Sequence, residues 1–176
     1  RECFVEDITN SEVASAFGAD LLLLNGVDVF EPKISGLKAK TDEMIAKLHE
    51  LTGRPLGVNL EPVDQNAKMA EDRLDISAGR KATSDTFRRI ETLGFDFVCL
   101  TGNPGTGVTN AQIKDAIVQA KRAFSGLIIA GKMHGAGVAE PVVDLEVTSE
   151  LLEAGADIIL VPAVGTVPGF TQAQLC

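Results

Sequence analysis

The sequence predicts an α/β fold, a (β/α)8 TIM barrel with about five to six β/α units present. A Gly-x-Asp tripeptide followed by four apolar residues occurs three times, at residues 18–24, 94–100 and 155–161. Four apolar residues fit a buried parallel strand and are too few for a helix. Expected strands recur every 30 to 40 residues without a reversal of order, which favours a barrel over the alternative, a complete five-stranded doubly wound sheet.

The first half of the chain is expected to form two helices and two strands. Residues 9–11 are competent N-caps for the first helix, and Thr41 can cap the second. Gly53 and Pro62 are stop signals after the second helix and the second strand. The expected bounds are a helix over 10–17, a strand over 21–25, a helix over 42–51 and a strand over 56–61.

The longest connection, residues 62–83, leaves the second strand, and we expect a short helix within it at 67–74. Loops of this length are often lids, and the alternative is a surface excursion. Ser84 and Asn110 are expected to cap the two helices that follow. The expected bounds are helices over 85–93, 110–124 and 144–154, strands over 95–101, 127–131 and 158–161, and a helix starting after 171.

Length and composition limit the class of protein. A closed barrel needs about 250 residues, whereas the chain has 176, so we expect one α/β-barrel domain, 1–176, truncated at both ends. A net charge of −9 and the absence of Trp and Tyr disfavour nucleic acid as a partner. No apolar run approaches the roughly 18 residues of a membrane span. Three widely spaced cysteines without a Cys-x-x-Cys pair indicate reduced thiols, so we expect a cytoplasmic protein.

Candidate site residues follow from the strand ends, where parallel α/β folds bind ligands. Alternation over 56–61 places apolar residues on one face and Asn59 and Glu61 on the other, which we expect to face the barrel lumen. Lys132 can bind a phosphate or carboxylate or form a Schiff base, and His134 can transfer protons. We predict Glu61, Lys132 and His134 as catalytic; the alternative is that these groups only satisfy neighbouring loops or lie solvated on the rim.

Two glycine-rich loops follow the third and fourth strands, at 101–110 and 131–137. Their backbone N–H groups and hydroxyls can bind an anion, although the order of a P-loop or a dinucleotide fingerprint is missing. The alternative is a flexible turn. A divalent metal such as Mg²⁺ is conceivable from carboxylate and imidazole donors, but no spacing demands it, and no metal ligand is assigned. The predicted ligand-binding residues are Asn25, Asp28, Asn59, Thr101, Asn103, Gly105, Gly107 and Gly135.

Four segments together resemble a bacterial group of uncharacterised TIM-barrel proteins, some of which carry the label haloacid dehalogenase-like hydrolase. These segments are 17–28, 57–62, 100–107 and 131–137. The hydrolase label implies an Asp-x-Asp nucleophile motif after the first strand, which this chain lacks. The Gly-x-Asp-strand units also resemble phosphate-binding barrels of small-molecule metabolism. Those barrels hold phosphate after their seventh and eighth strands.

These observations predict a small-molecule metabolic enzyme of TIM-barrel type with its site at the carboxyl ends of the strands. We expect a phosphorylated or carboxylated substrate and lyase, aldolase or isomerase-like proton chemistry. Metal-assisted hydrolysis, or a non-catalytic role in binding or assembly, are the alternatives. Expected partners are a small anionic ligand and, because a partial barrel exposes sheet edges, a second copy of the chain.

Overall fold

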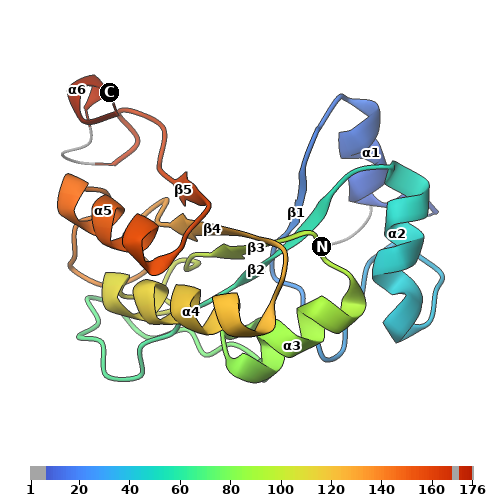
Figure 1. Cartoon of the computed structure of the whole chain (residues 1–176), viewed down its shortest axis with the longest axis horizontal. Coiled ribbons are helices and arrows are strands. Elements are labelled where there is room, and N and C mark those ends of the chain that lie inside the picture. The colour runs from blue at the N-terminus through green and yellow to red at the C-terminus, as the bar shows by residue number, and fades with distance from the viewer. Residues whose placement is uncertain (1–6, 168–170, 176) are drawn as a thin grey trace.

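The computed structural model describes residues 7–167 and 171–175 and contains one parallel sheet in the order β1-β2-β3-β4-β5. Figure 1 shows the sheet with helices α1 to α5 arranged around it, and β1 and β5 are its two edges. This arrangement confirms the predicted α/β class. The strands are β1 (Leu22–Leu24), β2 (Leu56–Leu60), β3 (Phe97–Leu100), β4 (Leu127–Gly131) and β5 (Ile158–Leu160). The helices are α1 (Asn10–Ala16), η1 (Thr41–Glu43), α2 (Met44–Thr52), η2 (Ala78–Arg80), α3 (Ser84–Leu93), α4 (Asn110–Ala123), α5 (Leu145–Ala154) and α6 (Gln172–Leu175).

Three predicted helix caps are wrong by position. Thr41 lies inside the 3-10 turn η1 rather than before a helix. Ser84 and Asn110 are the first residues of α3 and α4, because the extended residues before them, Thr83 and Thr109, accept hydrogen bonds from backbone N–H groups of the first turn. In both helices the threonine is the N-cap, one position before the residue predicted from the sequence.

The predicted helix at 67–74 is absent, and this segment has an irregular backbone. Two of its N–H groups bond to other loops instead of to the preceding turn of the same segment. Ala70 donates to the carbonyl of Gly137, and Leu74 donates to the carbonyl of Gly105, at 2.9 and 2.8 Å. Tertiary contacts with the two glycine-rich loops therefore replace the local helical pattern.

One face of the sheet packs against the helices and forms the core. The parallel register aligns Leu56 with Leu22, and Val58 with Val98 and then Ile128, on this face. These five side chains are buried in one cluster with residues of α2, α3 and α4. The alternation predicted for strand two is confirmed, with its apolar face on the helical layer. Among the residues described, no helix combines the length and the apolar character needed to cross a bilayer.

The repeated Gly-x-Asp unit has a structural explanation. Gly94 and Gly155 end α3 and α5 in the left-handed region, with φ of +79° and +110°, as predicted. The aspartates that follow cap the neighbouring strand: Asp96 accepts from Leu56 N at 2.7 Å, and Asp157 accepts from Ile128 N at 2.8 Å. This backbone hydrogen bond is the main reason why the pKa of Asp157 is lowered. These two copies of the motif thus each end a helix and align two strands, whereas Asp20 of the first copy is exposed and pairs with Arg54.

The opposite face of the sheet is more open. Leu23, Leu127 and Ile158 lie on it and are 46%, 51% and 41% exposed. Gly57 also lies on this face, beside the ring of Phe97. A Cβ atom at Gly57 would lie 2.1 Å from the nearest carbon of that ring, so only glycine fits there. Asn59 follows two residues later, so this face leads directly to the polar ends of the strands.

Candidate functional site at the carboxyl ends of the strands

Three loops cover the carboxyl ends of β2, β3 and β4 as one connected layer: 61–83, 101–109 and 132–143. Gly107 N donates to Ala136 O at 2.9 Å, which joins the two glycine-rich loops. Arg73 of the long connection donates to the carbonyl oxygens of Thr106 and Ala67, each at 3.4 Å. The long connection is thus anchored on the strand ends, the position expected of a lid; whether it opens stays a prediction.

Asparagine side chains meet where β1 and β3 end. Asn25 Nδ2 donates to Asn103 Oδ1 at 3.0 Å, and Asn103 Nδ2 lies 3.1 Å from Asn25 Oδ1. Asn25 is exposed and Asn103 is half-buried, so the pair presents amide groups to solvent. Two residues that lie 78 positions apart in the sequence are thereby brought together.

Asn59 extends this pair into the sheet and is buried. Its amide lies 3.1 Å from Asn25 Oδ1 on one side, and 2.9 and 3.3 Å from the carbonyl oxygens of Cys99 and Thr101 on the other. Because carbonyl oxygens only accept hydrogen bonds, the amide nitrogen of Asn59 is best assigned to that side, where it donates to β3. The Asn59 oxygen then faces Asn25 Oδ1, and because both atoms are acceptors, Asn59 lies against Asn25 without a hydrogen bond to it. Asn59 then ties the cluster to β3.

Glu61 lies directly after β2 and is 1% exposed. Its Oε1 accepts from Arg80 Nη2 at 2.6 Å and from Asn103 Nδ2 at 2.8 Å, and its Oε2 accepts from Asn103 N at 2.9 Å. Both oxygens are therefore engaged, and the buried charge has a cationic partner. The carboxylate fixes the backbone and side chain of Asn103, and through it Asn25. We define the amide network as Asn25, Asn59, Glu61, Arg80 and Asn103.

Lys132 follows β4, and its side chain is also 1% exposed. Its Nζ donates to Glu140 Oε2 at 2.9 Å, and the same oxygen accepts from Asn110 N, the first N–H of α4, at 2.9 Å. Burial lowers the pKa of Lys132, against the opposite influence of Glu140. No hydrogen bond among the described residues joins Lys132 to the amide network, so the structure places these predicted residues in two neighbouring clusters.

His134 is half-buried in the loop after β4. Its Nδ1 accepts from Ala136 N at 3.0 Å, so in the neutral ring the proton lies on Nε2. Ala136 itself has a φ of +53°, which a non-glycine residue rarely adopts. The loop is thus held in a conformation that fixes one tautomer of the imidazole and leaves Nε2–H as a donor.

Asp28 serves the loops around it. Burial raises its pKa, but hydrogen bonds from Ser77, Phe30, Glu31 and Gly79 outweigh that effect, so the pKa is lowered overall. A Cβ on Gly79 would stand 1.7 Å from Asp28 Oδ1, which shows how closely the carboxylate packs against this turn. No hydrogen bond or ion pair joins Asp28 to a side chain of the amide network in the described part of the chain.

The remaining predicted residues lie in the loop layer. Gly105 and Gly107 have positive φ and bond through their carbonyls to the long connection, and Gly135 O accepts from Val138 N. Thr101 Oγ1 is buried without a hydrogen-bond partner among the described residues, as is Arg80 Nε. These two unpartnered polar atoms lie at the end of β3 and in the amide network.

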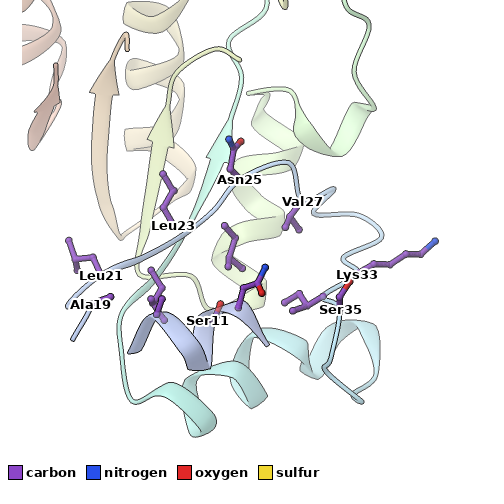
Figure 2. A pocket seen from close by; sticks show the side chains of 13 residues that line it. Ser11, Ala19, Leu21, Leu23, Asn25, Val27, Lys33 and Ser35 are labelled. Carbon is purple, nitrogen blue, oxygen red and sulfur yellow. The ribbon is translucent and has the colours of Figure 1, made fainter. Parts of the chain in front are cut away.

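A cavity of about 400 Å³ borders Asn25. It is lined by β1, by α1 and by residues 33–35, with polar groups from Ser11 and Ser35 beside the leucines of β1. Figure 2 shows Asn25 at the far end of this cavity from α1, and Lys33 extending away from it. The exposed end of the amide network therefore opens onto a hollow that can hold a small molecule.

The donor chemistry does not fit a metal centre. No group of three or more His, Cys, Asp or Glu side chains comes close enough to hold a metal ion within the described residues. Glu61 already binds the cationic Arg80, and the groups around it are amides. An Mg²⁺ ion at this position would compete with a guanidinium for the same carboxylate.

Sequence reasoning missed Arg80 and Glu140. Arg80 lies in η2, within the long connection. The sequence could have indicated it only indirectly, because a buried carboxylate needs a positively charged partner. Glu140 lies eight positions after Lys132, outside the glycine-rich segment that drew attention to this loop. Both partners depend on how irregular loops fold back, which spacing does not reveal.

Known structures share the fold. A phosphonopyruvate hydrolase, crystallised as a complex with oxalate and Mg++, is 16% identical, with a TM-score of 0.55 over 94% of this chain and 59% of that chain. Two proteins from Burkholderia cenocepacia J2315 are also similar. A putative phosphonomutase is 19% identical (TM-score 0.55, 91% of this chain, 66% of that chain), and a putative lyase/mutase is 16% identical (TM-score 0.53, 93% and 61%).

At these identities the likeness shows a partial TIM-barrel-like fold, and the chain spans 59% to 66% of the length of these structures. No curated protein matches the chain. A family model described as a domain of unknown function (DUF7916) matches residues 1–176. None of these descriptions names a haloacid dehalogenase or a phosphate-binding barrel, so neither label is supported.

Proposed function

Because the chain belongs to the DUF7916 family, a domain of unknown function, we propose its activity from the site itself. We propose an enzyme of small-molecule metabolism that acts on a carboxylated or phosphorylated substrate by lyase- or isomerase-type proton chemistry. The hydrolase, mutase and lyase/mutase named among the structures of similar fold support this class of reaction.

The amide network is the observation that carries this proposal. Amide groups from three consecutive strand ends converge, and a buried carboxylate holds them in place. Positions at the carboxyl ends of barrel strands are where TIM-barrel enzymes bind substrates. Amide N–H donors can orient a carboxylate or carbonyl oxygen, and fixing them beforehand lowers the entropic cost of binding. The neighbouring cavity supplies room for the remainder of the substrate.

The residues divide into two kinds of role. His134 presents a half-buried Nε2–H donor at the carboxyl end of the sheet, and an imidazole in such a position suits proton transfer. Lys132 supplies a buried positive charge for an anionic group. Glu61 remains a predicted catalytic residue. Because both of its carboxylate oxygens are already engaged, however, we favour a role in which Glu61 positions Asn103 and Arg80. A metal-assisted hydrolase is not proposed, because the donors present do not suit a divalent ion.

A thermal-shift screen with carboxylated and phosphorylated metabolites tests the proposal. We expect members of one of these classes to raise the melting temperature of the wild-type chain. The Asn103→Ala variant is expected to lose that shift, because Asn103 links the exposed amide of Asn25 to Glu61. Gln119→Ala is the matched control, since it removes an exposed amide on α4 whose partner is Ser84.

Two outcomes would contradict the proposal. One is the absence of any shift with either class of metabolite. The other is a ligand-induced shift of the same size in Asn103→Ala, Gln119→Ala and wild type, since the amide network would then not contact the ligand.

A further inference from the structure

The buried ammonium of Lys132 is incompletely paired. A lysine ammonium has three N–H donors, and within the described residues Nζ donates to Glu140 alone. Two donors of a side chain that is 1% exposed are therefore without a protein acceptor. Buried charged groups normally have their donors satisfied, so such a group indicates a place for an additional anionic acceptor.

Glu140 is engaged on one side only. Its Oε2 accepts from both Lys132 Nζ and Asn110 N, while no donor among the described residues reaches its Oε1. Its side chain is 33% exposed, and it lies in an irregular loop rather than in a helix or strand. The carboxylate is thus held by two contacts at a single oxygen and can rotate toward solvent without breaking a secondary-structure element.

The donors that Glu140 contacts come from two independent elements. Lys132 lies at the end of β4, and Asn110 N is the first N–H of α4, a helix of 14 residues. The N–H of Gln112 is already used by the Thr109 cap, whereas that of Asn110 points to Glu140. A positive side chain and a helical N–H of the first turn therefore converge on one carboxylate oxygen at the carboxyl ends of the strands.

We propose that Lys132 and Asn110 N form an anion subsite that the carboxylate of Glu140 fills as an internal plug, and that an anionic group of the substrate displaces it. This inference rests on the proposed function and adds where the charged group of the substrate binds. A carboxylate or phosphate brings two or more oxygens, which can accept from the unused N–H groups of Lys132 as well as from Asn110. Displacement of Glu140 then sends a negative charge to solvent and moves the loop that carries His134.

Isothermal titration calorimetry with inorganic phosphate and, separately, oxalate tests the plug. Glu140→Gln removes the competing charge, so we expect it to bind at least one of these anions about tenfold more tightly than wild type. Glu150→Gln is the matched control, because Glu150 pairs with Lys114 at 3.0 Å on the exposed surfaces of α4 and α5. That control is expected to bind like wild type, and Lys132→Met is expected to lose binding. Tightening with phosphate alone indicates a phosphorylated substrate, and tightening with oxalate alone a carboxylated one.

Equal or weaker anion binding by Glu140→Gln would overturn the plug, as would the absence of binding at millimolar anion in this variant. If Glu140→Gln is poorly folded by circular dichroism, Glu140→Ala replaces it, with the same outcomes deciding. Failure here is distinguishable from failure of the proposed function, which is tested separately by the effect of Asn103→Ala on metabolite shifts.

Discussion

Glu61 and Lys132 are equally buried at the ends of β2 and β4, yet their surroundings differ. The carboxylate of Glu61 accepts three hydrogen bonds, from Arg80 and from two groups of Asn103. Among the residues that the structure describes, the ammonium of Lys132 donates to a single partner, and that partner is itself partly exposed. One buried charge is fully satisfied inside the protein, and the other is not.

This difference separates a charge that maintains structure from one that is available for a ligand. Removing one partner from a satisfied buried pair leaves the other charge uncompensated, which is strongly destabilising. Removing a poorly satisfied buried charge also removes its desolvation cost, so the loss of stability is small. Stability measurements on the two sites can therefore test the comparison without knowledge of the substrate.

The largest effect is expected for Glu61→Ala. Arg80 loses its ionic partner and Asn103 loses two acceptors, so the free energy of unfolding should fall by about 3 kcal/mol. Urea denaturation followed by circular dichroism measures this loss. Asp85→Ala is the matched control, because Asp85 pairs with Arg88 at the surface of α3, where such pairs contribute less than about 1 kcal/mol. Equal effects of the two substitutions would show that Glu61 is not a structural centre.

A smaller effect is expected for Lys132→Met, which keeps most of the length of the side chain and removes the charge. Glu140 can turn to solvent, so the free energy of unfolding should change by less than about 1 kcal/mol. The same urea titration measures it. If the free energy of unfolding falls as much as it does in Glu61→Ala, Lys132 stabilises the fold as Glu61 does, and the proposed difference between the two sites is wrong.

The pH dependence of Lys132→Met sharpens the same comparison. Burial lowers the pKa of Lys132 in the folded chain, so the unfolded chain holds the proton more firmly. Between the lowered pKa and the ordinary value of about 10.4, the unfolded state binds more protons, and stability rises with pH. Wild type should therefore gain stability relative to Lys132→Met as the pH is raised through this window. If the difference in the free energy of unfolding between wild type and Lys132→Met stays constant with pH, the prediction that burial lowers the pKa of Lys132 is wrong.

The sequence predicted the fold better than the site, for physical reasons. Glycines 94 and 155 and the apolar runs after them specify local conformations, so helix ends and strands could be located from short patterns. The polar face of strand two could likewise be predicted from alternation, and Asn59 and Glu61 lie where it placed them. That the domain is truncated at both ends stays a prediction.

The pairing of the site residues could not be predicted, because it depends on loops. Glu61, Lys132 and His134 were predicted together as catalytic residues, but Gly131 has a φ of +145° at the end of β4, beyond which strand alternation no longer applies. Lys132 is therefore joined through Glu140 to the first residue of α4 rather than to the amide network. Contacts of this kind join residues that lie 8 to 78 positions apart in the sequence and leave no periodic signal.

The smallest effect on stability is expected for Asn25→Ala, at the outer end of the amide network. Asn25 is exposed, and its loss leaves Asn59 bonded to the backbone of β3 and Asn103 bonded to Glu61, so the free energy of unfolding should stay within about 0.5 kcal/mol. Metabolite shifts, in contrast, should fall as they do for Asn103→Ala, because Asn25 borders the cavity. Unfolding and ligand titrations on one preparation measure both quantities. Unchanged ligand shifts would mean that the substrate binds elsewhere and that the satisfied charge of Glu61 serves the fold alone.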